Sequence, residues 1–187
     1  MKKFSLVIII LFSSCLSWAE LHFIKEDLHF SLDKENFYVE GDYYLENTSS
    51  KTSSKKIFYP FPEHESYGKI TEITVTIDNS EVPLIRRENG VEFYLQVSPN
   101  ETKIFNVKYA QPYQGNQVEY ILITTNNWHQ PLQQANYSLV FPKYLKLEEL
   151  SYLPDSLEDL SEEFRFYWSK ENFLPGHNFI VRFNKIK

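Results

Sequence analysis

The sequence predicts an all-β fold, an antiparallel β-sandwich of the immunoglobulin-like kind with about ten short strands and at most one short helix. Apolar and polar residues alternate along most of the chain, which is the two-residue period of a strand. Segments rich in Asn, Pro, Ser and Gly separate these runs, as turns do. No apolar pattern long enough for a crossover helix intervenes. A closed barrel is the alternative architecture.

The N-terminal part of the domain predicts two strands followed by a loop and a shorter strand. Apolar residues share one face over Leu28 to Leu32 and again over Phe37 to Leu45. The segment from Asn47 to Lys56 is polar throughout and predicts a loop. Ile57 to Tyr59 then predicts a short strand that ends at Pro60, because proline has no N–H to donate to a ladder.

The middle of the chain predicts a series of hairpins. Ile73 to Ile77 alternates with threonine and is followed by a polar turn. Asn89-Gly90 is a strong hairpin signal, because both residue types adopt the positive φ that a two-residue turn requires. Val91 to Val97 and Lys103 to Tyr109 then predict two further strands.

The C-terminal part predicts strands separated by longer loops. Val118 to Thr124 predicts a strand buried on both faces, and Asn126 to Gln134 predicts a loop that carries Trp128 and His129. The one candidate helix is Ser156 to Glu163, which has serine at the N-cap position and early acidic residues that suit a helix N-terminus. Further strands are expected at Ala135 to Phe141, Phe164 to Trp168 and Phe179 to Phe183.

The first residues of the chain have the three parts of an export signal. Lys2-Lys3 supplies a positive start, and Leu6 to Phe12 is an apolar segment shorter than the roughly 20 residues of a transmembrane helix. Small residues at the end of the leader favour cleavage after Ala19. The sequence thus predicts a signal peptide over 1–19 and a single β-sandwich domain over 20–187, exported to the periplasm or the extracellular space.

Cys15 gives the leader a second possible fate. Phe12 to Cys15 resembles the cleavage box of bacterial lipoproteins, in which the cysteine becomes the lipidated first residue. Lipidation at Cys15 would anchor the domain to the cell envelope, whereas cleavage after Ala19 would release it. Cys15 is also the single cysteine of the chain. A domain that starts after Ala19 therefore has neither a disulfide nor a thiolate ligand.

Net charge restricts the partners that we expect. The chain carries 19 Lys and Arg against 25 Asp and Glu, a formal net charge of −6. Nucleic acids and anionic membranes attract clustered basic residues, so neither is an expected partner. No apolar stretch after the leader is long enough for a transmembrane span. The expected partner is therefore an unidentified protein or glycan.

Three stretches of the chain together resemble known domains. Tyr44 to Pro62 combines a strand, an Asn-Thr-Ser loop and a Phe-Pro strand. Tyr120 to Pro142 contains a Thr-Thr pair, a tryptophan and a strand with a central tyrosine, and Phe166 to Phe183 joins an aromatic-Trp strand to an Asn-Phe turn. This combination resembles exported bacterial domains of unknown function with an immunoglobulin-like sandwich. The resemblance implies a fold and carries over no active site.

Catalytic and cofactor motifs are missing from the sequence. It contains no Gly-x-Ser-x-Gly elbow, no glycine-rich phosphate loop and no His-Glu-x-x-His pair. The acidic run from Ser156 to Glu163 lacks the apolar pocket and the facing carboxylate that a glycosidase requires. We therefore expect no enzyme activity, no catalytic residue, no cofactor and no metal. The leading hypothesis is a non-catalytic interaction or structural module of the periplasm or cell envelope.

Two alternatives depend on particular side chains. Trp128 and His129 in one loop and His177 in another form a candidate ligand-contact surface if the two loops meet. A metal-dependent hydrolase would need two of His64, His129 and His177 to converge with a carboxylate. A carbohydrate-binding module would instead need Tyr and Trp residues to line up exposed on one sheet face, for which Tyr38 and Tyr44 are candidates.

Overall fold

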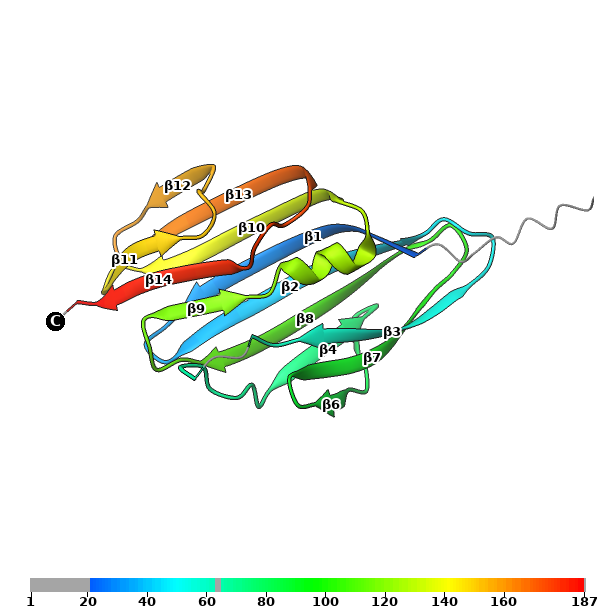
Figure 1. The fold of residues 1–187 in the computed structure, drawn as a ribbon, viewed down its shortest axis with the longest axis horizontal. Coiled ribbons are helices and arrows are strands. Elements are labelled where there is room, and N and C mark those ends of the chain that lie inside the picture. The colour runs from blue at the N-terminus through cyan, green and yellow to red at the C-terminus, as the bar shows by residue number, and fades with distance from the viewer. Residues whose placement is uncertain (1–20, 63–64, 187) are drawn as a thin grey trace, which may run out of the picture.

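The computed structural model describes residues 21–62 and 65–186, and these form a sandwich of two β-layers (Figure 1). One layer is a single eight-stranded sheet, in which neighbouring strands are antiparallel except for the parallel pair β1 and β10. The strands of this sheet, in spatial order, are β12 (Ser156–Asp159), β13 (Glu163–Phe173), β10 (Leu132–Pro142), β1 (Leu21–Leu32), β2 (Asn36–Asn47), β8 (Thr102–Pro112), β4 (Ile73–Ile77) and β5 (Ser80–Glu81).

The opposite layer is divided into two three-stranded sheets. The helix η1 (Ile123–Trp128), a 3-10 helix, lies between them in Figure 1, beside β9 and β3. It is the only helix among the described residues, so none of these forms a helix long and apolar enough to cross a bilayer. The two sheets are β11 (Leu145–Leu150), β14 (Phe179–Lys185) and β9 (Gln117–Tyr120), and β3 (Ser53–Pro60), β7 (Gly90–Val97) and β6 (Ile85–Arg87).

The all-β sandwich predicted from alternation is confirmed. The eight-stranded sheet is open, with β12 and β5 at its two edges, which distinguishes the sandwich from the closed alternative. The described residues form fourteen strands rather than about ten, and β1 and β2 are each 12 residues long. Long strands form because neither segment contains a proline, which would remove a hydrogen-bond donor from the ladder.

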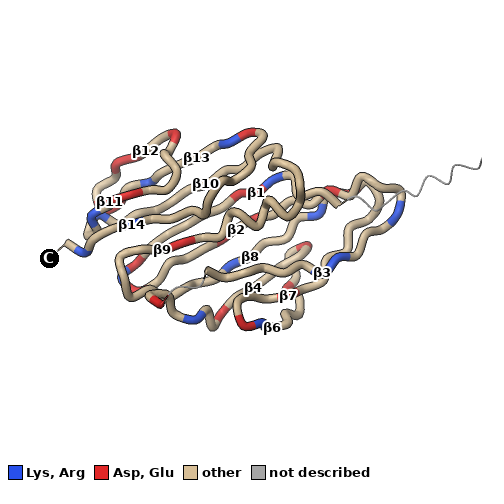
Figure 2. Tube along the Cα trace, in the orientation of Figure 1, with Lys and Arg blue, Asp and Glu red and all other residues tan. Residues whose placement is uncertain are grey.

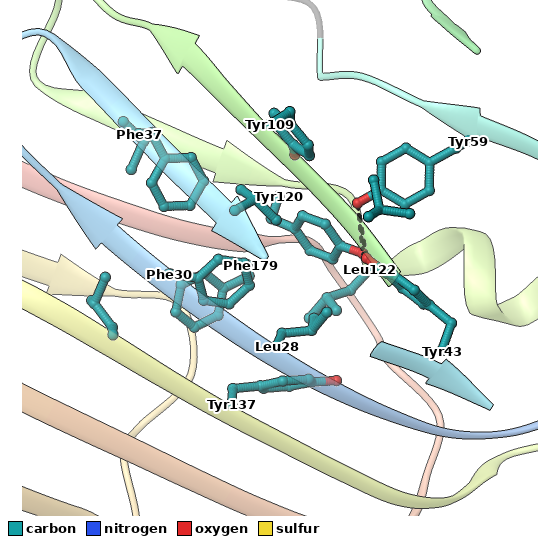
Figure 3. Packing of buried hydrophobic residues seen from close by; sticks show 14 of the residues in the cluster. Leu28, Phe30, Phe37, Tyr43, Tyr59, Tyr109, Tyr120, Leu122, Tyr137 and Phe179 are labelled. Carbon is teal, nitrogen blue, oxygen red and sulfur yellow. Dashed lines mark hydrogen bonds between the residues drawn. The ribbon is translucent and has the colours of Figure 1, made fainter. Parts of the chain in front are cut away.

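The core is made by the inward faces of the two layers and is rich in aromatic side chains (Figure 3). Phe30 on β1 stacks on Phe179 on β14, with ring centroids 4.7 Å apart, so these two rings join the layers directly. Trp168 on β13 packs edge-on against the same Phe179 ring at 5.2 Å. Burial of one such side chain contributes about 1.5–3 kcal/mol, so this cluster can hold the domain together without a disulfide.

Charged residues are interspersed along the strands and turns of both layers (Figure 2). Several form ion pairs across neighbouring strands, such as Lys108 with Glu40 at 2.7 Å. Exposed pairs of this kind contribute little to stability, about 0–1 kcal/mol each. The fold therefore depends on its apolar core, and the surface charges mainly keep the sheets solvated.

The helix predicted over Ser156 to Glu163 is wrong. Ser156–Asp159 forms β12, which pairs antiparallel with β13. Leu157 and Leu160 are 51% and 38% exposed, so this segment has no buried apolar face that would stabilise a one- or two-turn helix. The edge of the large sheet instead supplies hydrogen-bond partners for its backbone.

The strand predicted over Val118 to Thr124 ends early, at Tyr120. The chain then enters η1, where the N–H groups of Leu122 and Ile123 both donate to Asn178 Oδ1, at 3.2 and 3.3 Å. A side chain from the loop before β14 thus provides the acceptor that a ladder neighbour would have provided. Alternation alone does not reveal such a partner, because it lies 55 residues further along the chain.

The loop predicted over Asn47 to Lys56 is shorter than expected. Strand β3 begins at Ser53, which lies opposite Val97 on β7. The remaining turn is fixed by the buried Asn47 amide, whose Nδ2 donates to the Lys51 carbonyl at 2.8 Å. The lysines near its end therefore lie on a strand with defined faces.

Candidate functional site

A cavity of about 370 Å³ lies between the two layers and is bordered by η1. Its lining comes from β1, β2 and β8 of the large sheet, from β3 and β9 of the opposite layer, and from η1 itself. The cavity therefore occupies the place where the second layer is divided. Its aromatic lining includes Phe23, Tyr43, Tyr59, Phe105, Tyr120 and Trp128.

Three buried tyrosine hydroxyls meet in the wall of this cavity (Figure 3). Tyr43 comes from β2, Tyr59 from β3 and Tyr120 from β9, so each belongs to a different sheet. The Tyr43 hydroxyl shares hydrogen bonds with those of Tyr120, at 2.7 Å, and Tyr59, at 2.8 Å. Burial holds the pKa of all three hydroxyls well above its ordinary value. They therefore remain neutral groups that can both donate and accept.

Glu26 adds a buried carboxyl group to the same cavity. A β-bulge between Phe23 and Lys25 shifts the register, so both Phe23 and Glu26 face inward. The Tyr137 hydroxyl donates to Glu26 Oε1 at 2.5 Å. Burial raises the pKa of Glu26 to about 7, the Tyr137 hydrogen bond opposes this rise and the nearby charge of Asp27 adds to it.

Two lysines of β3 line the mouth of the cavity, and their environments differ. Lys56 Nζ lies 3.3 Å from Glu92 Oε1, so its charge is paired. Lys55 Nζ instead lies 4.2 Å from the centre of the Trp128 ring, a cation–π contact. Across residues 21–62 and 65–186, Lys55 forms no ion pair. Among the described residues, the mouth therefore carries one positive charge that no carboxylate neutralises.

The predicted ligand-contact residues are only partly brought together. The two loops do meet, because Asn126 Nδ2 donates to the Pro175 carbonyl at 3.2 Å. Trp128 lines the cavity, whereas His129 is exposed where η1 ends and has a φ of 57°. His177 stacks on Tyr152, with ring centroids 4.2 Å apart. The three side chains thus have separate surroundings.

The two alternative functions, metal-dependent hydrolysis and carbohydrate binding, depend on metal ligands and on exposed aromatic residues, respectively. In the described part of the chain, no three His, Cys, Asp or Glu side chains gather as metal ligands. His64 and Cys15 lie outside the described residues. Tyr38 is 39% exposed on β2, but of the tryptophans that the structure describes, Trp168 is buried and Trp128 lines the cavity. Neither of these two tryptophans joins Tyr38 on an exposed sheet face.

Glu26 is a site residue that the sequence motifs do not indicate. Leu28, Phe30 and Leu32 share one face of their strand, and two positions before Leu28 the same alternation reaches Glu26. A carboxylate at the end of an inward-facing apolar row indicates a buried polar site. The alternation predicts that Tyr43 lies on the inward face of its strand, but its contact with Tyr59 and Tyr120 depends on the arrangement of three sheets.

The lining defines what the cavity can do chemically. Among the described residues that line it, Glu26 is the only carboxylate, and a pair of facing carboxylates is not present. Its other polar groups are tyrosine and threonine hydroxyls, the Asn127 amide and two lysines. This arrangement suits a ligand with an apolar body and a few polar groups, since small-molecule sites combine apolar walls with a small number of oriented polar groups.

The fold and this cavity define a class, the all-β sandwich domain with a largely apolar cavity between its layers that contains a few polar groups. Residues 97–181, fewer than half of the chain, match the family model described as a domain of unknown function (DUF4424). The expected resemblance to a domain of unknown function is confirmed by this match. No curated protein sequence matches the chain.

Solved structures share the fold at low sequence identity. A proposed nutrient-binding protein from Legionella pneumophila is 14% identical and superposes with a TM-score of 0.72, over 90% of this chain and 68% of that protein. An M1 zinc metallopeptidase from Deinococcus radiodurans is 11% identical, with a TM-score of 0.56 over 88% of this chain and 42% of the enzyme. This chain therefore spans less than half of the metallopeptidase.

Proposed function

We propose that this protein is a non-catalytic, exported binding domain that holds a small amphipathic molecule in the cavity between its layers. The observation that carries the proposal is the lining itself, in which aromatic walls surround the buried Glu26 carboxyl and the hydroxyls of Tyr43, Tyr59 and Tyr120. A volume of about 370 Å³ falls within the range of ligand sites, roughly 300–1,000 Å³.

Binding accounts for this lining better than catalysis does. A hydrolytic site needs a nucleophile or a second carboxylate beside the first, or a metal that activates water. The cavity offers one carboxyl group together with hydroxyls whose pKa is raised by burial, which makes them poor nucleophiles. A binding role is also the one named for the Legionella protein that shares this fold, and it supports the proposal by analogy of fold.

Occupancy of the cavity can be tested with the domain that begins at residue 20 and an apolar fluorescent dye, 8-anilinonaphthalene-1-sulfonate. Thr124 lines the cavity, and a Thr124→Trp side chain would fill it. Ile123→Trp is the matched control, because Ile123 is the preceding residue of η1 and is 42% exposed. We expect saturable dye binding to the parent domain and to Ile123→Trp, and loss of binding in Thr124→Trp. Equal binding by all three proteins would overturn the proposal.

The exported location rests on the leader, and it is tested separately. We expect cell fractionation to place the protein outside the cytoplasm, with a mature N-terminus at Glu20. Lipid modification that is lost in Cys15→Ala would instead identify the anchored form. Retention of the intact leader in the cytoplasm would contradict export.

A further inference from the structure

Two side chains of opposite charge lie at different depths of the same cavity. Glu26 is 2% exposed in its interior, whereas Lys55 is exposed at its mouth. We propose that the ligand is a small zwitterion with an apolar body, of the type of a large apolar amino acid or dipeptide, whose ammonium group binds Glu26 and whose carboxylate binds Lys55. This inference rests on the proposed binding function and names its ligand class.

The interior end has the groups that an ammonium ion needs. Tyr137 satisfies Glu26 Oε1, and within the described chain no hydrogen bond reaches Oε2. Tyr43 lies directly opposite Glu26 in the pairing of β1 with β2, and its hydroxyl is bonded to that of Tyr120. A buried carboxylate is costly unless it is paired, so a bound ammonium ion would compensate its desolvation.

The aromatic lining near Glu26 strengthens the case for a cation. The faces of aromatic rings attract ammonium groups, and the attraction increases when water is excluded. Phe23 and Tyr43, whose ring centroids are 6.1 Å apart, both line the cavity. The ionisable groups that interact with Glu26 are Asp27, which lies next to it in the sequence, and four tyrosines, Tyr43, Tyr120, Tyr137 and Tyr152.

The mouth has the groups that a carboxylate needs. Lys55 Nζ is held over the Trp128 ring, and because this contact leaves its charge unneutralised, the ammonium can still pair with an anion. The side chains of Thr124, Thr125 and Asn127 on η1 line the same cavity and carry hydrogen-bond donors. The neighbouring Lys56 has Glu92 as its partner, so it is not equivalent.

A ligand with only one charge would leave one end of the site unpaired. Sites built to pair a polar group reject analogues that lack it, because their own buried groups then lose their partners. Phe105, Leu45 and Ile57 supply apolar lining for the body of the ligand. The site should therefore prefer the zwitterion over both of its singly charged analogues.

Calorimetric titration of the domain that begins at residue 20 tests this preference directly. The zwitterions are L-leucine, L-phenylalanine and L-leucyl-L-phenylalanine, and the singly charged analogues are 2-phenylethylamine and 3-phenylpropionate. We expect at least one zwitterion to bind about tenfold or more tightly than either analogue, the ratio that one charge-assisted hydrogen bond provides. An analogue that binds as tightly as every zwitterion overturns the inference, as does failure of all three zwitterions to bind.

Variants that each remove one charge test which group of the ligand binds at which end of the cavity. Glu26→Gln should weaken zwitterion binding about tenfold or more and spare 3-phenylpropionate, and Lys55→Met should weaken zwitterion binding and spare 2-phenylethylamine. Lys108→Met is the matched control and should bind as the parent does, because Lys108 pairs with Glu40 on the exposed surface and does not line the cavity. Dye binding without zwitterion preference would refute the ligand class and leave the proposed function standing. If the parent domain binds neither the dye nor any of the zwitterions, both the ligand class and the proposed binding function are refuted.

Discussion

The hydroxyls of Tyr43 and Tyr120 lie 2.7 Å apart and form a hydrogen bond between the two layers of the sandwich. Tyr43 belongs to the eight-stranded sheet and Tyr120 to the sheet of β11, β14 and β9. The hydroxyl of Tyr59 brings the third sheet to the same point. The divided layer is thus fixed to the large sheet by polar contacts, at the place where the cavity interrupts apolar packing.

Removal of the Tyr43 hydroxyl should therefore destabilise the whole domain. In Tyr43→Phe the hydroxyls of Tyr59 and Tyr120 remain buried, and the distance between them is 3.4 Å, so both lose their best partner. We expect the free energy of unfolding to fall by about 1–3 kcal/mol. Equilibrium unfolding in urea, followed by tryptophan fluorescence, measures this change.

Tyr109→Phe is the matched control for this measurement. The Tyr109 hydroxyl is buried and has no hydrogen-bond partner among the described residues. Its removal should leave the free energy of unfolding unchanged within about 0.5 kcal/mol, or raise it, because an unpaired buried hydroxyl is itself unfavourable. Equal destabilisation by the two variants would contradict the role assigned to the Tyr43 hydroxyl.

Glu26 should make the stability of the domain depend on pH near neutrality. Its pKa is about 7 in the folded protein against an ordinary value of 4.5, so the folded state binds the proton more tightly than the unfolded state. The resulting stabilisation is complete below pH 4.5 and is lost as the pH rises through 7. Two and a half pKa units correspond to a loss on the order of 3 kcal/mol.

Comparison with Glu26→Gln isolates this contribution. Gln is neutral at every pH, so the variant lacks the loss, and groups common to both proteins cancel in the difference. The lowered pKa of Asp27 acts below its ordinary value of 3.8, outside this window. We expect the stability of the parent to fall relative to the variant between pH 5 and 8, as measured by urea unfolding at each pH. A difference that does not change with pH would show that Glu26 does not titrate in this range.

The fold was largely predictable because alternation is a local property. Leu28 to Leu32 and Phe37 to Leu45 show the inward face of their strands directly in the sequence. The predicted helix over Ser156 to Glu163 and the predicted extent of the strand over Val118 to Thr124 were wrong because residues distant in the sequence determine the local structure there. Asn178 accepts hydrogen bonds from the backbone at the start of η1. Ser156–Asp159 forms a strand because its backbone pairs with the edge of β13. Neither partner can be recognised from a pattern within a few residues.

The site was predictable only in its parts. Glu26 could be placed on an inward face by extending one alternation, and Trp128 was singled out as a loop aromatic. Their convergence was not predictable, because it requires β1 and η1 to lie across the sandwich from one another. Lys55 could not be assigned either, since the segment that contains it reads as a uniform polar run.

Gly41 should be intolerant of a side chain although it lies within a regular strand. A Cβ built on Gly41 would lie 2.6 Å from the Tyr43 hydroxyl and 2.6 Å from Leu28 Cδ2, closer than real Cβ contacts. Gly41→Ala should displace the Tyr43 ring and lower the free energy of unfolding by about 1–3 kcal/mol. Gly176→Ala is the control and should have little effect, because nothing lies within 4 Å of the corresponding position. Similar unfolding midpoints for both variants would contradict this close packing.

Asn178 should determine how firmly η1 closes the cavity. Its Oδ1 accepts from the N–H groups of Leu122 and Ile123, and its Nδ2 donates to Glu119 Oε1 at 2.6 Å. In Asn178→Ala the two N–H groups lose their acceptor, so we expect faster hydrogen exchange at both amides and a loss of about 1–2 kcal/mol in stability.

The control for this last prediction is Asn184→Ala. Asn184 Nδ2 donates to Glu148 Oε1 at 2.9 Å on the exposed surface, so its removal should change stability by no more than about 0.5 kcal/mol. Hydrogen exchange followed by NMR reports each amide separately. The amides of β14 should keep their protection in both variants, because their ladder partners on β9 and β11 are unchanged. Unchanged exchange at Leu122 and Ile123 in Asn178→Ala would show that η1 is held by its other contacts.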